Sequence, residues 1–209
     1  MGTFLPNNSA HIRQLVLASS SPRRRELVAS LGLSLPVLIL SSDTDEGTPS
    51  HYTPVQIVEQ LGLRKAKATA AMLLGEEASV SLIIGADTIV VLDGEVLGKP
   101  KDRRDAIRML TLLQGKAHEV YTGIACVDPS AGRELASHRM TKVVMKPLTA
   151  AMIERYVDSG EPMDKAGSYG IQGRGAVLVD RIDGCYFNVV GLSLTLFSDM
   201  LAEFGIEVI

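Results

Sequence analysis

The 209-residue sequence has no tryptophan, few aromatic residues and no block of charges of one sign. Lysine and arginine number 21 against 24 aspartates and glutamates, so the formal net charge is −3. Proteins that hold nucleic acid along a broad face usually carry a basic excess, together with aromatic side chains on which bases stack. The composition therefore disfavours a nucleic-acid-binding module. A small acidic ligand, which needs only a few local cations, remains open.

Cysteine is nearly absent: Cys126 and Cys185 stand far apart and form no CxxC pair. We expect two reduced thiols, as is usual in a cytoplasmic protein. No apolar run approaches the roughly 18 residues of a membrane-spanning helix. The first residues also lack the basic segment and long apolar segment of a signal peptide. We therefore expect a cytoplasmic protein without a membrane partner.

Several widespread catalytic motifs are missing as well. The sequence contains no GxxxxGK[ST] phosphate loop, no HExxH zinc motif and no GxSxG nucleophile turn. Its four histidines show no spacing typical of metal ligands. P-loop nucleotide hydrolases, zinc proteases and serine hydrolases of the GxSxG type are therefore not expected.

Hydrophobic periodicity and turn signals predict an α/β fold with long antiparallel strands. We expect strands at 15–18, 36–41, 80–92, 118–129 and 134–148. We expect helices at 22–31, 54–74, 103–114, 149–160 and 192–205. The pattern indicates one domain over residues 13–209, preceded by a flexible polar extension over residues 1–12.

Turn and capping residues add detail. Asp93-Gly94 and Asp183-Gly184 are dipeptides that favour tight hairpin turns, and the second predicts a hairpin within 175–191. Thr53 and Gln56 have the spacing of a capping box. Gly62 is a weak point inside the helix that this box opens.

The stretch "SSSPRRRE" at 19–26 predicts an anion site. A strand that ends in small polar residues and then opens a helix presents backbone N–H groups and a positive dipole end. Ser19 and Ser21 add hydroxyls, and Arg23 and Arg24 add guanidinium groups suited to phosphate oxygens. A capped surface helix with solvated arginines is the alternative.

Asp87 lies in the middle of the apolar run "LIIGADTIVVL". A buried carboxylate is costly unless it is paired, hydrogen-bonded or bound to a metal. Asp87 is therefore either a general base or metal ligand in a cleft, or a structural acid whose natural partner is Lys99.

The glycine-rich stretch "EPMDKAGSYGIQGRGA" at 161–176 allows the backbone to approach a ligand closely. Gln172 in its middle carries a donor and an acceptor, which reading a base edge requires. The spacing of its glycines is not that of a dinucleotide-binding fingerprint, and a flexible loop is the plainer interpretation.

Taken together these stretches resemble the Maf family of nucleoside triphosphate pyrophosphatases over residues 15–204. The resemblance is carried by "LVLASSSPRRRELVASLG", "DE" at 45–46, "KA" at 65–66, "GADTIV", "GEVLGKP", "VYTGIA", "DKAGSYGIQGRGA" and "YFNVVGL". It implies cleavage of a nucleoside triphosphate between the α and β phosphates, and a divalent metal, Mg²⁺ or Mn²⁺. The implied fold is inosine-triphosphatase-like: a long twisted mixed sheet with flanking helices and a central cleft, often in a homodimer.

The resemblance also assigns roles to residues. It implies that Asp87 accepts the proton, and that Arg23, Thr88 and Gln172 determine substrate choice. Glu46, Lys65 and Lys99 match the acidic loop and lysines that handle phosphate and metal, so Glu46 and Asp87 are the expected metal ligands. The motif "YGIQG" is similar to that of the branch acting on dTTP and UTP, rather than the 7-methyl-GTP branch.

Three other functions stay open at this point. The first is a nucleotide-binding regulator of septum formation in which turnover is incidental, since family members have been linked to division arrest. The second is a phosphatase that releases inorganic phosphate from another metabolite. A nucleic-acid-binding module is the most distant.

Overall fold

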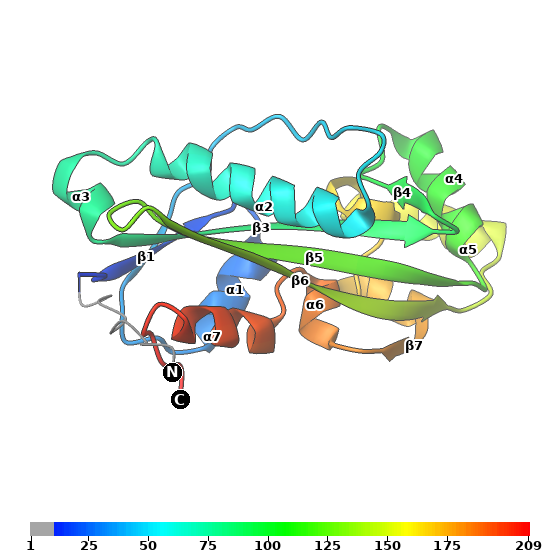
Figure 1. Ribbon diagram of the computed structural model, residues 1–209. Coiled ribbons are helices and arrows are strands. Elements are labelled where there is room, and N and C mark those ends of the chain that lie inside the picture. The colour runs from blue at the N-terminus through cyan, green and yellow to red at the C-terminus, as the bar shows by residue number, and fades with distance from the viewer. Residues whose placement is uncertain (1–10) are drawn as a thin grey trace, which may run out of the picture.

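The computed structural model describes residues 11–209. Its centre is a seven-stranded mixed sheet of order β2-β1-β3-β5-β6-β7, in which β4 pairs with β3 outside this path (Figure 1). The strands are β1 (Gln14–Ala18), β2 (Val37–Ile39), β3 (Ser81–Leu92), β4 (Glu95–Leu97), β5 (Ala117–Asp128), β6 (Arg133–Met145) and β7 (Val179–Asp183). Strand β1 runs parallel to β2 and β3, and the remaining pairs are antiparallel. The mixed sheet with flanking helices confirms the predicted fold class.

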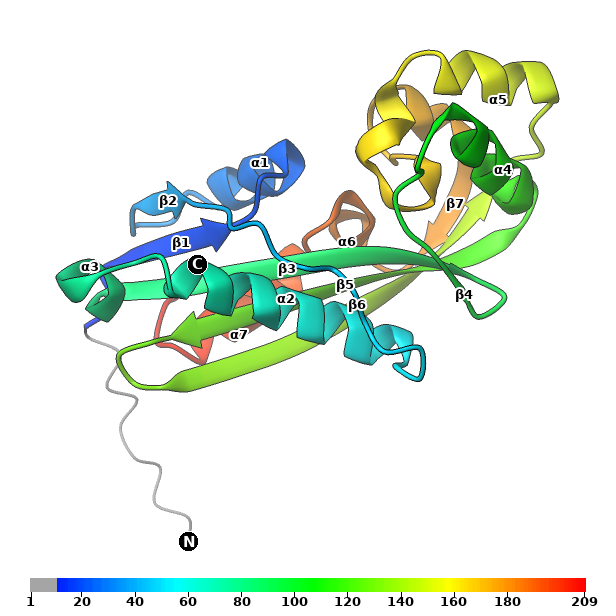
Figure 2. The ribbon, with the colours of Figure 1, turned by 90° about the horizontal axis from the view of Figure 1, so that it is seen from above.

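Helices cover both faces of this sheet. They are α1 (Pro22–Ser30), α2 (Pro54–Ala70), α3 (Gly75–Ser79), α4 (Arg103–Leu113), α5 (Ala150–Val157), α6 (Tyr186–Val190) and α7 (Leu194–Ala202). Helix α2 runs along one face, while α1, α6 and α7 lie on the other, and α4 and α5 gather at one end (Figure 2). One hydrophobic cluster joins the sheet to α1 and α7, and a second joins it to α4 and α5.

Helix α2 lies unusually close to β3 and β5 because two strand positions are glycine. A Cβ atom on Gly85 would lie 2.1 Å from the carbonyl oxygen of Gly62, and one on Gly123 would lie 2.3 Å from that of Val58. Backbone atoms cannot yield to such contacts, so both strand positions require glycine. The capping box of Thr53 and Gln56 is present, as predicted. The helix ends at Ala70 rather than near residue 74, and the short α3 follows it.

The predicted hairpin at Asp93-Gly94 is present, and both residues have positive φ, as its turn requires. The hairpin predicted at Asp183-Gly184 is wrong: β7 ends there, and the chain turns into helix α6. The reason lies in side chains of β6 and α6. The N–H of Cys185 donates to the hydroxyl of Thr141 (3.1 Å), and the amide of Asn188 donates to the same oxygen (3.1 Å).

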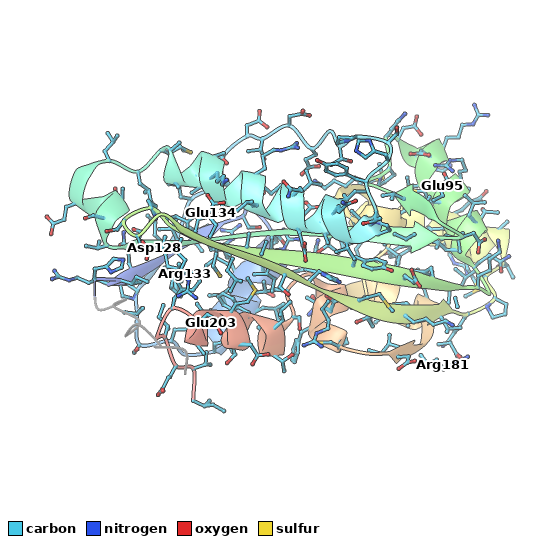
Figure 3. All side chains as sticks on the ribbon, in the orientation of Figure 1. Glu95, Asp128, Arg133, Glu134, Arg181 and Glu203 are labelled. Carbon is cyan, nitrogen blue, oxygen red and sulfur yellow. The ribbon has the colours of Figure 1, made fainter. Side chains whose placement is uncertain are left out.

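The turn between β5 and β6 is tied to the end of α7 (Figure 3). Within the turn, Asp128 Oδ1 accepts the N–H groups of Ser130 and Ala131 at 3.0 and 3.1 Å. Across from it, the guanidinium of Arg133 pairs with Glu203 at 3.0 Å and lies 4.5 Å from the ring centre of Phe204. These contacts hold the far end of the long hairpin against the C-terminal helix.

The predicted N-terminal extension, residues 1–12, lies outside the described residues except at its last two positions. There Ile12 is buried and His11 Nε2 lies 3.0 Å from Asp128 Oδ2. Cys126 and Cys185 are both free thiols. Over residues 11–209, none of the helices has the length and apolar character needed to cross a membrane.

Candidate functional site

A cavity of about 600 Å³ opens where the two hydrophobic clusters meet. Its volume falls within the range of about 300–1,000 Å³ that is usual for small-molecule sites. All of the residues singled out from the sequence line it: Ser19, Ser21, Arg23, Arg24, Glu46, Lys65, Asp87, Thr88, Lys99 and Gln172. The cavity thus brings together segments from the first strand to the glycine-rich stretch.

Parallel pairing of β1 with β3 aligns the first two of these segments. Ala18, the last residue of β1, pairs with Gly85 of β3. The serines that follow β1, and the start of α1, therefore lie beside Asp87. Two stretches that are far apart in the sequence form one wall of the cavity.

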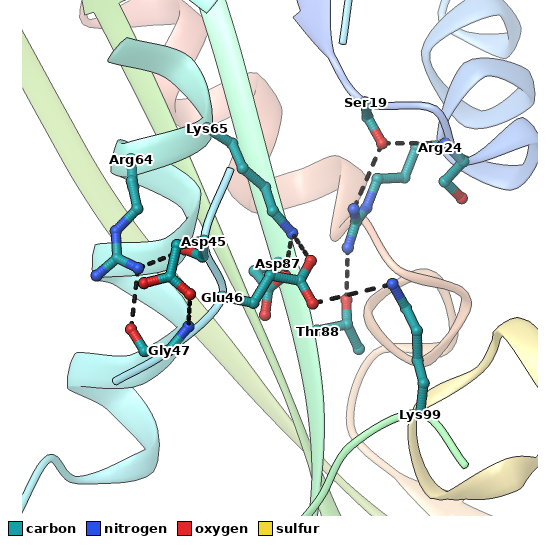
Figure 4. Close-up of polar contacts among 11 residues, drawn as sticks. Ser19, Arg24, Asp45, Glu46, Gly47, Arg64, Lys65, Asp87, Thr88 and Lys99 are labelled. Atoms are coloured by element: carbon teal, nitrogen blue, oxygen red, sulfur yellow. Dashed lines mark hydrogen bonds and ion pairs between the residues drawn. The ribbon is translucent and has the colours of Figure 1, made fainter. Parts of the chain in front are cut away.

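Asp87 is almost buried, with 8% of its surface exposed, and its charge is balanced by Lys65 of α2. Lys65 Nζ donates to Asp87 Oδ1 at 2.5 Å and to Glu46 Oε1 at 2.8 Å (Figure 4). The hydrogen bond from Lys65 holds the pKa of the Glu46 carboxyl below its usual value. The structural partner expected for Asp87 was Lys99, and this expectation is wrong: Lys99 Nζ lies 4.0 Å from Glu46 Oε2 instead.

The loop that carries Glu46 is fixed to α2 by Arg64. Its guanidinium donates to the carbonyl oxygens of Asp45 (2.5 Å) and Gly47 (2.9 Å), on either side of Glu46 (Figure 4). Asp45 Oδ1 also accepts the N–H of Gly47 at 2.9 Å. Sequence reasoning missed Arg64, because a charged residue on a helix carries no signal for the loop that it holds.

Protein groups hold the Arg24 guanidinium at the base of the site. Its Nε donates to the carbonyl oxygen of Gly191 (2.8 Å), its Nη2 to the hydroxyl of Thr88 (2.9 Å) and its Nη1 to that of Ser19 (3.4 Å). Burial lowers the pKa of the Arg24 guanidinium, but arginine titrates so far above neutrality that the charge is kept. Ser21 is the N-cap residue of α1, and its side chain makes no capping hydrogen bond.

Helix α1 also meets the glycine-rich stretch, through a chain of ion pairs. Arg23 Nη1 lies 3.4 Å from Asp164 Oδ2, and Lys165 Nζ lies 2.7 Å from Asp164 Oδ1. Lys165 also donates to the carbonyl oxygen of Glu161. Asp164 and Lys165 line the cavity too; they begin the motif "DKAGSYGIQGRGA", but no role was predicted for either side chain.

The stretch expected as a flexible loop is a series of short 3₁₀ turns. They are η1 (Glu161–Asp164), η2 (Ala166–Ser168) and η3 (Gly173–Leu178). Gln172 lies between the last two turns and lines the cavity. The segment is therefore held in a defined conformation.

The donor set suits a hard divalent cation that also binds substrate. Among residues 11–209 no three or more His, Cys, Asp or Glu side chains form a metal-binding group. Mg²⁺ is nevertheless commonly held by one or two carboxylates together with substrate phosphates. Glu46 and Asp87 supply two carboxylates on one cavity, and Asp87 Oδ2 receives no hydrogen bond from the described residues. These residues fit such a cation.

Comparison with known proteins identifies the family of this chain. Residues 14–204 match the family described as Maf-like protein. A relative from Desulforamulus reducens, named dTTP/UTP pyrophosphatase, is 48% identical over 95% of this chain and 100% of its own length. One from Moorella thermoacetica with the same name is 52% identical over 93% of this chain and 97% of its own.

Among solved structures, the crystal structure of protein VC0702 from Vibrio cholerae aligns with a TM-score of 0.42 and 11% identity. That alignment covers 91% of this chain and 98% of the other. The family match spans nearly the whole of the described chain, and the named relatives share about half of its residues. The chain belongs to the Maf family.

Proposed function

We propose that this protein hydrolyses dTTP and UTP between the α and β phosphates, releasing a nucleoside monophosphate and pyrophosphate. The observation that carries the proposal is Asp87, a nearly buried carboxylate aimed into a cavity that cations surround. The relatives named dTTP/UTP pyrophosphatase support the choice of substrate. They match this chain over almost their full length.

The cavity can bind the negatively charged triphosphate through positively charged side chains. Arg23 and Arg24 come from α1, Lys65 from α2 and Lys99 from the segment after β4. Ser19 and Ser21 add hydroxyl groups beside the start of α1. Positioned cations that neutralise developing charge are the main source of rate enhancement in phosphoryl transfer.

In the proposed reaction Asp87 acts as general base. Its Oδ1 accepts a hydrogen bond from Lys65, whereas Oδ2 accepts none from residues 11–209 and could take a proton from water. The water oxygen bonds to the α-phosphorus, the bond from that phosphorus to the bridging oxygen breaks, and pyrophosphate leaves. Lys65 and Lys99 line the same cavity and would stabilise the charge that the pyrophosphate gains.

A divalent cation, Mg²⁺ or Mn²⁺, would be held by Glu46 and Asp87 together with the phosphates. When bound, it would supply charge neutralisation at the phosphate oxygens. Lys65 bridges these two carboxylates and keeps them at one side of the cavity.

Substrate choice would come from Arg23, Thr88 and Gln172. The side-chain amide of Gln172 can pair with the edge of a pyrimidine, because it offers a donor and an acceptor. Thr88 would act through Arg24, since its hydroxyl accepts a hydrogen bond from that guanidinium at 2.9 Å. The cytoplasmic location expected from the composition stays a prediction. The homodimer implied by the resemblance stays one too, and light scattering would test it.

The proposal is tested by incubating the protein with a panel of nucleoside triphosphates and Mg²⁺, measuring pyrophosphate and phosphate separately. We expect pyrophosphate from dTTP and UTP, and a loss of about 10²–10⁴-fold in the Asp87→Asn variant. Asp93→Asn is the matched control, because Asp93 is an exposed acid at the end of the same strand hairpin. Phosphate as the product, or full turnover by Asp87→Asn, would overturn the proposal.

A further inference from the structure

The position of Gln172 is set by its neighbours rather than by its own contacts. In residues 11–209 the Gln172 side chain receives no hydrogen bond from another side chain or from the backbone. It lies between two 3₁₀ turns and directly before Gly173, whose φ is +62°. A side chain that selects a ligand must be held to within a fraction of an ångström. Something else must therefore fix this stretch of backbone.

The carboxylate of Glu161 supplies one part of that support. Its Oε2 accepts the N–H of Arg174 at 3.0 Å, and its Oε1 accepts the N–H of Gly175 at 2.9 Å. Both amides lie just after Gln172 in the chain. Hydrogen bonds to an ionised carboxylate are stronger than those between neutral groups. Glu161 therefore anchors the C-terminal side of the Gln172 segment.

Tyr156 of α5 supplies the other part. Its hydroxyl donates to Glu161 Oε1 at 3.0 Å and accepts the N–H of Gly170 at 3.2 Å. The Tyr156 ring is buried in the cluster that joins the sheet to α4 and α5. Glu161 and Tyr156 thus hold backbone amides on both sides of Gln172 and connect them to the core.

The glycines of the segment make room for this arrangement. A Cβ atom on Gly173 would lie 2.8 Å from Glu161 Oε2, and one on Gly175 would lie 2.1 Å from the carbonyl oxygen of Gly170. A side chain at either position would displace the carboxylate or the backbone that it holds. Glycine at positions 173 and 175 is therefore explained by the contacts that hold the Gln172 segment, without any dinucleotide fingerprint.

We propose that Glu161 and Tyr156 are positioning residues for base selection, holding Gln172 where it pairs with the pyrimidine. This inference rests on the proposed function, and it names which residues outside the base-reading contact control that contact. Neither side chain touches the substrate in this account. Their effect should therefore fall on the choice between bases, more than on the handling of phosphate.

The test is a double-mutant cycle read by binding instead of turnover. Isothermal titration would compare UMP with CMP, which differ only at the pyrimidine edge. The proteins are wild type, Glu161→Gln, Tyr156→Phe, Gln172→Ala and the Glu161→Gln/Gln172→Ala double variant. Glu154→Gln is the matched control, since Glu154 is an exposed glutamate on α5. Thermal melting of each variant checks that it folds.

We expect the preference of wild type for UMP over CMP to fall about tenfold in Glu161→Gln, because the amide offers one acceptor oxygen in place of two. The double variant should select no worse than Gln172→Ala alone, since both changes act through one contact. Tyr156→Phe should lower the preference in the same direction. If Glu161→Gln does not fold, Tyr156→Phe and the Tyr156→Phe/Gln172→Ala double variant replace it in the cycle.

Equal weakening of UMP and CMP in Glu161→Gln would overturn the inference, and so would additive effects in the double variant or a wild type without preference. Failure of the proposed function is separate. If no pyrophosphate is released but the base preference depends on Glu161, the proposed reaction is wrong and the positioning role stands. Normal pyrophosphate release by wild type, with a base preference unchanged in Glu161→Gln, would keep the proposed reaction and overturn the positioning role.

Discussion

Lys65 Nζ lies 2.5 Å from Asp87 Oδ1 and joins the proposed general base to helix α2. The side chains are 17% and 12% exposed, so each charge depends on the other for much of its stabilisation. Removing one member of such a pair leaves an uncompensated charge in a poorly hydrated place. The same contact therefore matters for folding and for the proposed chemistry.

Lys65→Met tests the structural side of this pair. We expect the free energy of unfolding to fall by about 2 kcal/mol, less than for a fully buried pair because both groups keep some contact with water. Adding Asp87→Asn should recover part of the loss, because the less exposed of the two carboxylates that lose Lys65 is then neutral. Urea unfolding measures all of these values. Strictly additive losses in the double variant would contradict the interpretation.

Gly62 and Gly85 form a matched pair of glycines for substitution. A Cβ atom on Gly62 would meet its nearest neighbours at 3.5 Å, which is ordinary contact. Gly62→Ala should therefore stabilise the protein by up to about 1 kcal/mol through helix propensity. Gly85→Ala places its Cβ 2.1 Å from a backbone oxygen and should destabilise by several times that amount. Thermal unfolding of both variants checks the opposite signs.

His118 should make stability fall on the acid side of neutrality. Its side chain is buried, Nε2 lies 2.7 Å from the Tyr169 hydroxyl, and burial lowers the pKa of the imidazole to about 4. Below the unfolded value near 6.5 the unfolded chain takes up a proton that the folded one refuses, so stability decreases as pH falls toward 4. The contribution is roughly 3 kcal/mol, at about 1.4 kcal/mol per pKa unit.

The measurement is urea unfolding at several pH values between 7 and 4 for wild type and His118→Gln. The difference between the two proteins should shrink as pH falls through this window. His51→Gln, at an exposed histidine, is the control. A constant difference for His118→Gln would show that the folded protein protonates His118 without penalty.

Arg64 should influence turnover through the loop that carries Glu46. Arg64→Ala removes both hydrogen bonds to the carbonyl oxygens that flank Glu46. We expect the Mg²⁺ concentration for half-maximal turnover to rise about tenfold, as is typical when support for a metal ligand is lost. Lys67→Ala on the same helix is the control, since Lys67 pairs with the distant Glu134. Equal Mg²⁺ dependence in both variants would exclude this role.

Much of the site could be predicted because its residues sit in short local motifs. "SSSPRRRE" at a strand-to-helix junction and Asp87 in an apolar run each left a structural alternative open on their own, and the combination of motifs favoured the site. Their meeting in one cavity follows from the parallel pairing of β1 with β3. The strand length and the hairpin at Asp93-Gly94 could also be predicted, because they depend on local alternation and turn preference.

The partners of these residues could not be predicted, because they depend on how helices cross the sheet. Lys65 reaches Asp87 only because Gly85 and Gly123 let α2 lie against β3 and β5. The turn at Gly184 follows contacts with Thr141, 44 residues away from Cys185, which override a local hairpin signal. The proposed role of Glu161 likewise depends on the fold, because the backbone amides after Gln172 donate to its carboxylate.

In the proposed reaction, water attacks the α-phosphorus with Asp87 as general base. Isotope labelling with ¹⁸O water tests this step most directly. The protein would be incubated with dTTP and Mg²⁺ in ¹⁸O-enriched water, and the products analysed by mass spectrometry. We predict that the label enters dTMP and not pyrophosphate, and that Asp87→Asn forms labelled dTMP at a rate lower by about 10²–10⁴-fold. Label in pyrophosphate or in inorganic phosphate would contradict the account.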